Sequence, residues 1–145
     1  MRMLAGLIML LPVAVLAESL RQIDYYDVWP NQYGKYGVTP IFGPVTVDGL
    51  QTLTLILKQH SRHGVLASIT LHYLDNRGDL HFSAPLRYQC MDDKNRCFLE
   101  FAIEARYENN LEIELLYQTL NDPERVIEYR IKDIGVMSSL LQKKR

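Results

Sequence analysis

The chain has 145 residues, of which 48% are hydrophobic, so it is large enough for one domain with a single core. Its 16 Lys and Arg residues and 17 Asp and Glu residues give a formal net charge of −1 at pH 7. This balance argues against the basic surfaces that bind nucleic acids or anionic bilayers.

Residues 1–17 have the pattern of a secretory signal peptide. Arg2 provides the positive start, residues 4–16 form an unbroken apolar run, and residues 15–17 end it with small or compact side chains. The run is shorter than the roughly 20 residues of a membrane-spanning helix, so we expect no membrane span after cleavage. The sequence therefore predicts a periplasmic or secreted protein, with one folded domain over residues 18–135.

Residues 25–44 combine aromatic rings with turn-forming residues. Prolines and glycines interrupt regular structure here, while Tyr and Trp offer large contact areas with few torsions to immobilise. One interpretation is a lid over one end or edge of the domain. The other is a recognition surface for a protein or a sugar face, for which the predicted binding residues are Tyr25, Trp29, Tyr33 and Tyr36.

After residue 44, apolar positions recur with a period of two between Gly, Pro, Asn and Asp residues. This pattern is typical of half-buried strands. We predict strands at 44–47, 51–58, 65–74, 79–82, 86–90, 97–107, 111–120 and 126–133. Helical spacing appears only at residues 136–145, which predicts a short helix or a disordered tail.

The turn at residues 108–110 predicts a hairpin that pairs Ile103 with Leu115 and Phe101 with Tyr117. This register sets Glu104 opposite Glu114, a like-charge contact that Lys132 on the following strand would relieve.

A second hairpin is expected at residues 75–78, where the turn would pair Leu71 with Phe82 and bring His72 opposite His81. Two imidazoles make only half a metal site, so His72 and His81 are a weak metal-binding candidate, and we expect no metal or other cofactor.

Cys90 and Cys97 are the two cysteines of the chain, and they flank a polar turn. In an oxidising compartment they are expected to form a disulfide that closes this turn. The bridge is a structural staple or a device that makes a binding loop rigid, and the third interpretation, a redox-active pair, lacks the two-residue cysteine spacing that lowers a thiol pKa.

Five glutamates alternate with apolar residues along the predicted strands, which is typical of the solvated face of a sheet. A pair of carboxylates can also serve glycoside hydrolysis, so these residues define the alternative of a small hydrolase. The five residues are Glu100, Glu104, Glu112, Glu114 and Glu128.

The predicted fold class is all-β: an antiparallel β-sandwich, broadly immunoglobulin-like, with a small closed β-barrel as the alternative. No Asn-x-Ser/Thr glycosylation motif occurs, which favours a bacterial envelope. We expect a non-catalytic module that binds an envelope or extracellular protein. A carbohydrate or cell-wall ligand on residues 25–44 is the second hypothesis, and the small hydrolase is the third.

Overall fold

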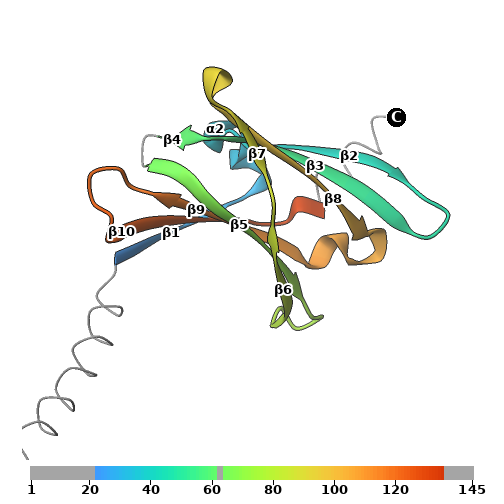
Figure 1. The fold of residues 1–145 in the computed structure, drawn as a ribbon. Coiled ribbons are helices and arrows are strands. Elements are labelled where there is room, and N and C mark those ends of the chain that lie inside the picture. The colour runs from blue at the N-terminus through green and yellow to red at the C-terminus, as the bar shows by residue number, and fades with distance from the viewer. Residues whose placement is uncertain (1–21, 62–63, 136–145) are drawn as a thin grey trace, which may run out of the picture.

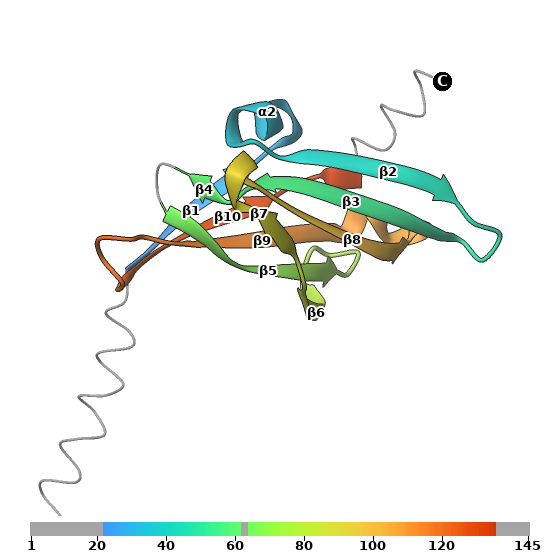
Figure 2. The same cartoon turned by 45° about the horizontal axis from the view of Figure 1, so that its top comes forward.

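Two β-sheets packed face to face make up most of the chain (Figures 1 and 2). The computed structural model describes residues 22–61 and 64–135, so the predicted signal peptide and C-terminal tail lie outside the described residues. In Figure 2, β2 and β3 form the upper layer and β5 and β9 the lower one. The prediction of a mostly β, two-sheet fold is confirmed, and one of the sheets is curled into half a barrel.

The larger sheet has six strands in the order β1-β10-β9-β5-β4, with β6 also paired to β5. Their bounds are β1 Gln22–Val28, β4 His60–Ser61, β5 Gly64–Leu74, β6 Leu80–Leu86, β9 Leu111–Gln118 and β10 Arg125–Ile131. β1 runs parallel to β10, so the expectation of a purely antiparallel sandwich was wrong.

The smaller sheet has four strands in the order β2-β3-β8-β7. They are β2 Thr39–Val45, β3 Leu50–Lys58, β7 Gln89–Met91 and β8 Arg96–Glu104. Pro40 and Pro44 fit into β2 because it is an edge strand, where a missing amide donor breaks no ladder. The short helices are η1 Pro30–Gln32, α2 Tyr33–Tyr36, η2 Asp92–Lys94 and η3 Ala105–Asn110.

The hydrophobic core lies between the two sheets and follows the period-two pattern of the sequence. Alternate residues of β3 and β9 are buried while the residues between them are half-buried, as expected for strands with one face on a core. Among the fully buried side chains are Leu53, Leu55, Leu57, Ile69, Ile103, Ile113, Leu115, Ile127 and Ile131.

The predicted hairpin between residues 97–107 and 111–120 is wrong. β8 pairs with β3, placing Ile103 beside Gln51, and β9 pairs with β5 and β10, placing Leu115 between Ile69 and Tyr129. The helix η3 occupies the predicted turn and carries the chain from one sheet to the other. Both strands keep their apolar faces inward, because period-two alternation specifies a face and not a partner.

The hairpin of β5 and β6 exists, but its predicted register was wrong. Asp75 Oδ1 accepts hydrogen bonds from the backbone amides of Arg77 and Asp79, at 2.8 and 2.9 Å, and an irregularity at the start of β6 shifts the pairing. Consequently Tyr73 pairs with Phe82, and His72 lies opposite Ser83 instead of His81.

The predicted disulfide between Cys90 and Cys97 is present in the structure. The two residues are direct cross-strand neighbours in the short pairing of β7 with β8, and η2 forms the turn between them. The bridge therefore closes this hairpin, at the top of Figure 1.

Candidate functional site

Residues 25–44 form ordered local structure instead of one irregular segment. They supply most of β1, then η1 and α2, and then most of β2. Pro30 stands at the first position of η1, where its missing amide donor costs nothing, and the Trp29 amide donates to Gln32 Oε1 at 3.1 Å. The chain turns out of α2 at Gly37, whose φ of 70° is in the left-handed region.

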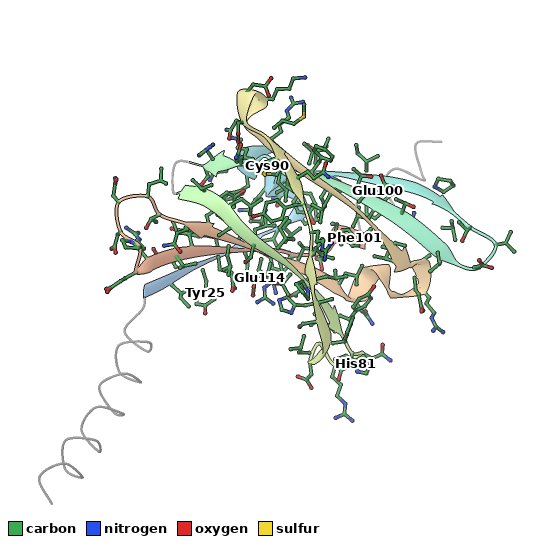
Figure 3. The ribbon with its side chains drawn as sticks, viewed as in Figure 1. Tyr25, His81, Cys90, Glu100, Phe101 and Glu114 are labelled. Atoms are coloured by element: carbon green, nitrogen blue, oxygen red, sulfur yellow. A yellow bond between two sulfur atoms is a disulfide. The ribbon has the colours of Figure 1, made fainter. Side chains whose placement is uncertain are left out.

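The four predicted binding residues occupy different environments. Tyr33 is only 3% exposed, and its hydroxyl donates to the carbonyl oxygen of Lys132, so it belongs to the core. Tyr36 is half-buried against the Tyr129 ring, with 5.3 Å between ring centroids. Tyr25 and Trp29 are exposed, and Tyr25 lies next to Glu128 on the outer face of the six-stranded sheet (Figure 3).

One of the four, Tyr36, lines a cavity of about 360 Å³ at the end of the sandwich where α2 and β4 lie. We call this cavity the tyrosine cleft. Its lining residues are Tyr26, Lys35, Tyr36, Lys58, His60, Ser61, Asn95, Tyr117 and Tyr129.

Four rings form the aromatic part of the tyrosine cleft, with Tyr129 at their centre. Its ring centroid is 5.5 Å from that of Tyr26 and 5.3 Å from those of Tyr36 and Tyr117. The parallel pairing of β1 with β10 sets Tyr26 directly beside Tyr129, while β9 contributes Tyr117 from the other side. Such tilted and edge-on contacts hold the rings in fixed orientations.

Hydrogen bonds fix the walls of the cleft. The Tyr117 hydroxyl donates to the carbonyl oxygen of Lys58 at 2.7 Å, which ties the six-stranded sheet to β3 of the other sheet. Burial, assisted by Tyr129, raises the pKa of Tyr117, so this hydroxyl keeps its proton. Asn95 joins the disulfide-closed hairpin to β4, because its Oδ1 accepts from the His60 amide at 2.6 Å and its Nδ2 donates to the His60 carbonyl at 3.0 Å.

Cationic side chains surround the tyrosine cleft. A second cavity of about 470 Å³ adjoins it, shares Lys58 and Asn95 with it, and adds Lys94 and Arg96 to the lining. Lys58 and Arg96 are direct cross-strand neighbours, an arrangement that is unfavourable without an anion. Within residues 22–61 and 64–135, no carboxylate forms an ion pair with Lys35, Lys58, Lys94 or Arg96.

The outer face of the six-stranded sheet has the opposite organisation, because its cations are paired. Arg130 contacts Glu114 at 3.1 Å, and Lys132 contacts Glu112 at 2.7 Å. Lys132 was expected beside Glu114, but it forms its ion pair with Glu112. The cation beside Glu114 is instead Arg130, its cross-strand neighbour.

Glu128 is the most buried carboxyl of this network, with 8% of its surface exposed. Burial is the main cause that raises its pKa to about 7, and interaction with Glu114 adds to the effect, while Arg130 opposes it. Near neutral pH the protonated form of Glu128 can therefore donate a hydrogen bond to Glu114.

The five predicted surface glutamates do not share one face. Glu100 and Glu104 belong to β8 in the four-stranded sheet, and the other three lie on β9 and β10. Figure 3 shows Glu100 and Glu114 on different strands, well apart in the view. The three glutamates of the six-stranded sheet are joined by Arg130, which makes them parts of one ion-pair network.

The proposed histidine pair is also separated. His72 Nδ1 lies 2.7 Å from Ser83 Oγ and its Nε2 lies 3.4 Å from Glu114, whereas His81 is on the projecting β5–β6 hairpin (Figure 3). In the described part of the chain there is no group of three or more His, Cys, Asp or Glu side chains able to hold a metal ion. No helix in the same residues has the length and hydropathy needed to cross a membrane.

Tyr36 is the one lining residue of the cleft that sequence analysis proposed for binding. The other lining residues, among them Tyr26, Tyr129 and the two lysines, were missed. The inward position of Tyr129 was predicted from its alternation along the strand, but its meeting with Tyr26 depends on a parallel strand pair between the two ends of the chain. No local pattern encodes that contact. The lysines carry no sequence signal of their own, because a lone Lys is usually a solvated residue.

Comparisons with protein-family models, with curated proteins and with solved structures give no match for this chain. The functional argument therefore depends on the geometry and charge of its own cavities.

Proposed function

We propose that this protein is an exported, non-catalytic binding module of the bacterial envelope, which holds an acidic segment of a partner protein in the tyrosine cleft. The observation that carries the proposal is the combination of clustered tyrosine rings with lysine side chains that have no carboxylate partner among the described residues.

An acidic ligand would complete the electrostatics of this end of the molecule. Lys58 and Arg96 repel each other across β3 and β8, and a carboxylate placed between them would offset this repulsion with two attractions. The positive charge of the cleft should also raise the association rate, because it attracts negatively charged partners. The chain as a whole is nearly neutral, so this attraction is local to the cleft.

The tyrosines favour a protein segment as the ligand. Tyrosine is one of the side chains most enriched at the centres of protein interfaces, since its ring buries a large area and its hydroxyl still finds a hydrogen-bond partner. Lys35 lies 5.6 Å from the ring centroid of Tyr36, so charge and aromatic surface act at the same place. The hydrogen-bonded walls would lose little entropy on binding.

Export fits this function. The pattern of residues 1–17 predicts secretion to an oxidising compartment, where a disulfide such as Cys90–Cys97 persists. That disulfide closes the hairpin that brings Asn95 to the cleft, which favours the interpretation of a binding loop made rigid.

The test is affinity capture from envelope extracts with the native protein and with a Lys35→Gln/Lys58→Gln variant. The matched control is Arg77→Gln/Arg106→Gln, which removes two positive charges from the far end of the molecule. We expect the native protein and the control to retain a partner that the cleft variant loses, and the captured partner to dock through an acidic segment mapped by crosslinking. Retention of the same partner by the cleft variant would reject the proposal.

A further inference from the structure

Another cavity, of about 660 Å³, lies at the opposite end of β5 from the tyrosine cleft. We call it the hairpin cleft, because it lies between the tip of the β5–β6 hairpin and the ends of η3 and β8. Its lining residues are Tyr73, Leu74, Asp75, Asn76, His81, Phe82, Glu104 and Asn110. Its volume is within the range of roughly 300–1,000 Å³ that is typical of small-molecule sites.

An aromatic pair forms one wall of the hairpin cleft. Tyr73 and Phe82 are cross-strand neighbours, with 5.6 Å between ring centroids and 37° between ring planes. Tyr73 follows Ile69 and Leu71 on the inner face of β5, so the apolar face of the sheet continues here to the surface. Phe82 is 52% exposed, although phenylalanine is one of the residue types most often buried in proteins.

Planar hydrogen-bonding groups form the rim of the same cleft. Asn110 Nδ2 lies 3.5 Å from Asn76 Oδ1, which connects η3 to the hairpin tip. Asp75 is oriented by the hydrogen bonds that its Oδ1 accepts from two backbone amides. Glu104 is held by Arg106, whose Nε lies 2.8 Å from Glu104 Oε2. The side-chain amides of this rim both donate and accept hydrogen bonds, and its carboxylates accept them.

We infer that the hairpin cleft is a binding site for a neutral saccharide. A sugar ring presents an apolar C–H face that stacks on an aromatic side chain, and its edge carries hydroxyl groups that each donate and accept. An exposed ring beside a rim of planar amides and carboxylates matches both parts of that chemistry.

Charge selects a neutral sugar over an acidic one. Asp75 and Glu104 bring carboxylates to the lining, and no Lys or Arg side chain among the described residues belongs to it. Because Arg106 pairs with Glu104, Asp75 is the carboxylate that would repel an anionic ligand here, in contrast to the tyrosine cleft. This inference does not rest on the proposed function of the tyrosine cleft, since the two cavities share no residue.

The test is calorimetric titration of the full exported chain with chitotetraose and with cellotetraose as neutral probes. The decisive variants are Phe82→Ala, which removes an exposed ring, and Asn76→Ala, which removes an exposed amide from the rim. The matched control is Phe98→Ala, because Phe98 is 39% exposed on β8 and lies outside the cavity. Thermal melting checks that each variant remains folded.

We expect at least one probe to bind, with a tenfold or greater loss of affinity in Phe82→Ala, a smaller loss in Asn76→Ala and a change within twofold in Phe98→Ala. Three results would overturn the inference. One is the failure of both sugars to bind the native chain. This result would count against the inference even if an apolar dye bound in the hairpin cleft and lost its binding in Phe82→Ala. The others are sugar binding unchanged in both decisive variants, and sugar binding lost on Trp29→Ala, which would place it on residues 25–44.

Discussion

Lys58 contributes to the tyrosine cleft through two separate parts of its structure. Its carbonyl oxygen accepts a hydrogen bond from the Tyr117 hydroxyl. Its aliphatic side chain packs over Gly37, and a Cβ added at Gly37 would lie 2.7 Å from Lys58 Cε. The positive φ of Gly37 favours glycine at this position, whereas the flexible Lys58 side chain could move away from an added Cβ. Because Gln keeps the backbone contact and much of the side-chain stem, Lys58→Gln tests the charge with little effect on the fold.

Glu128 should make stability depend on pH. Its pKa is raised to about 7, so between the ordinary value of 4.5 and 7 the folded chain binds more protons than the unfolded chain. The contribution of Glu128 to the free energy of unfolding is therefore present at low pH and is lost as pH rises through about 7. We expect Glu128→Gln to be more stable than the native chain by about 1–2 kcal/mol at pH 8 and nearly equal to it at pH 4.

Urea unfolding at both pH values measures this difference. Glu100→Gln, on an exposed residue of β8, is the control for loss of one carboxylate. A Glu128→Gln variant that is less stable than the native chain at pH 8 would show that the Arg130 ion pair outweighs burial.

Gly64 has a steric role that its neighbours in the sheet impose. A Cβ at this position would lie 2.2 Å from the Gln118 carbonyl oxygen, and the φ of Gly64 is 156°. We expect Gly64→Ala to lower the free energy of unfolding by at least about 2 kcal/mol, because the backbone of β5 must move away from β9. Gly49→Ala is the control, since Gly49 has a φ of 80° in open space and should cost only about 1 kcal/mol. Equal losses from denaturant curves would exclude the steric explanation.

At the level of elements, the disulfide-closed hairpin supports the cleft. β7 has only three residues and is an edge strand, so Cys90–Cys97 is its main attachment to β8. Replacement by Cys90→Ser/Cys97→Ala should lower the free energy of unfolding by about 2–3 kcal/mol, as expected for a short closed loop. It should also weaken binding of an acidic peptide, because the hairpin that carries Asn95 and Lys94 becomes less rigid. Denaturant unfolding and peptide titration check the two effects, and unchanged values for both would mean that η2 and Asn95 suffice to hold the hairpin.

The sequence predicts some elements well and others poorly, for a physical reason. β3 and β5 were predicted within one residue of their ends, because one face of each packs on the core and gives an alternating pattern, which one irregularity in β5 interrupts. β1 was missed because it is an edge strand with Ile23, Tyr25 and Tyr26 all exposed, so it has no clear apolar face.

Which strands pair with each other is harder to predict than which face of a strand is buried. The inward positions of Ile103 and Leu115 were predicted from their alternation, yet their expected pairing with each other was wrong, since η3 carries the chain to the second sheet. The candidate sites show the same limit. Tyr36 was proposed from its local composition, whereas Tyr26 and Tyr129 come from opposite ends of the chain and meet only in the folded sheet.

At the scale of the whole molecule, the tyrosine cleft and the hairpin cleft lie at opposite ends of β5 and differ in their chemistry. The tyrosine cleft combines rings with lysines, and the hairpin cleft combines rings with amides and carboxylates. The outer face of the six-stranded sheet between them has its charges paired internally. Under the two proposals, acidic and neutral ligands bind at separate ends, so variants at one end should leave binding at the other unchanged.

The central claim is that the tyrosine cleft binds an acidic protein segment. Its most direct test is a fluorescence anisotropy titration of a labelled peptide of glutamates and one tyrosine with the native chain, Lys35→Gln/Lys58→Gln and Arg77→Gln/Arg106→Gln. We predict binding that weakens with added salt, a tenfold or greater loss of affinity in the cleft variant, and a change within twofold in the control. Equal affinity of the cleft variant and the native chain, or no binding to the native chain at low salt, would contradict the claim.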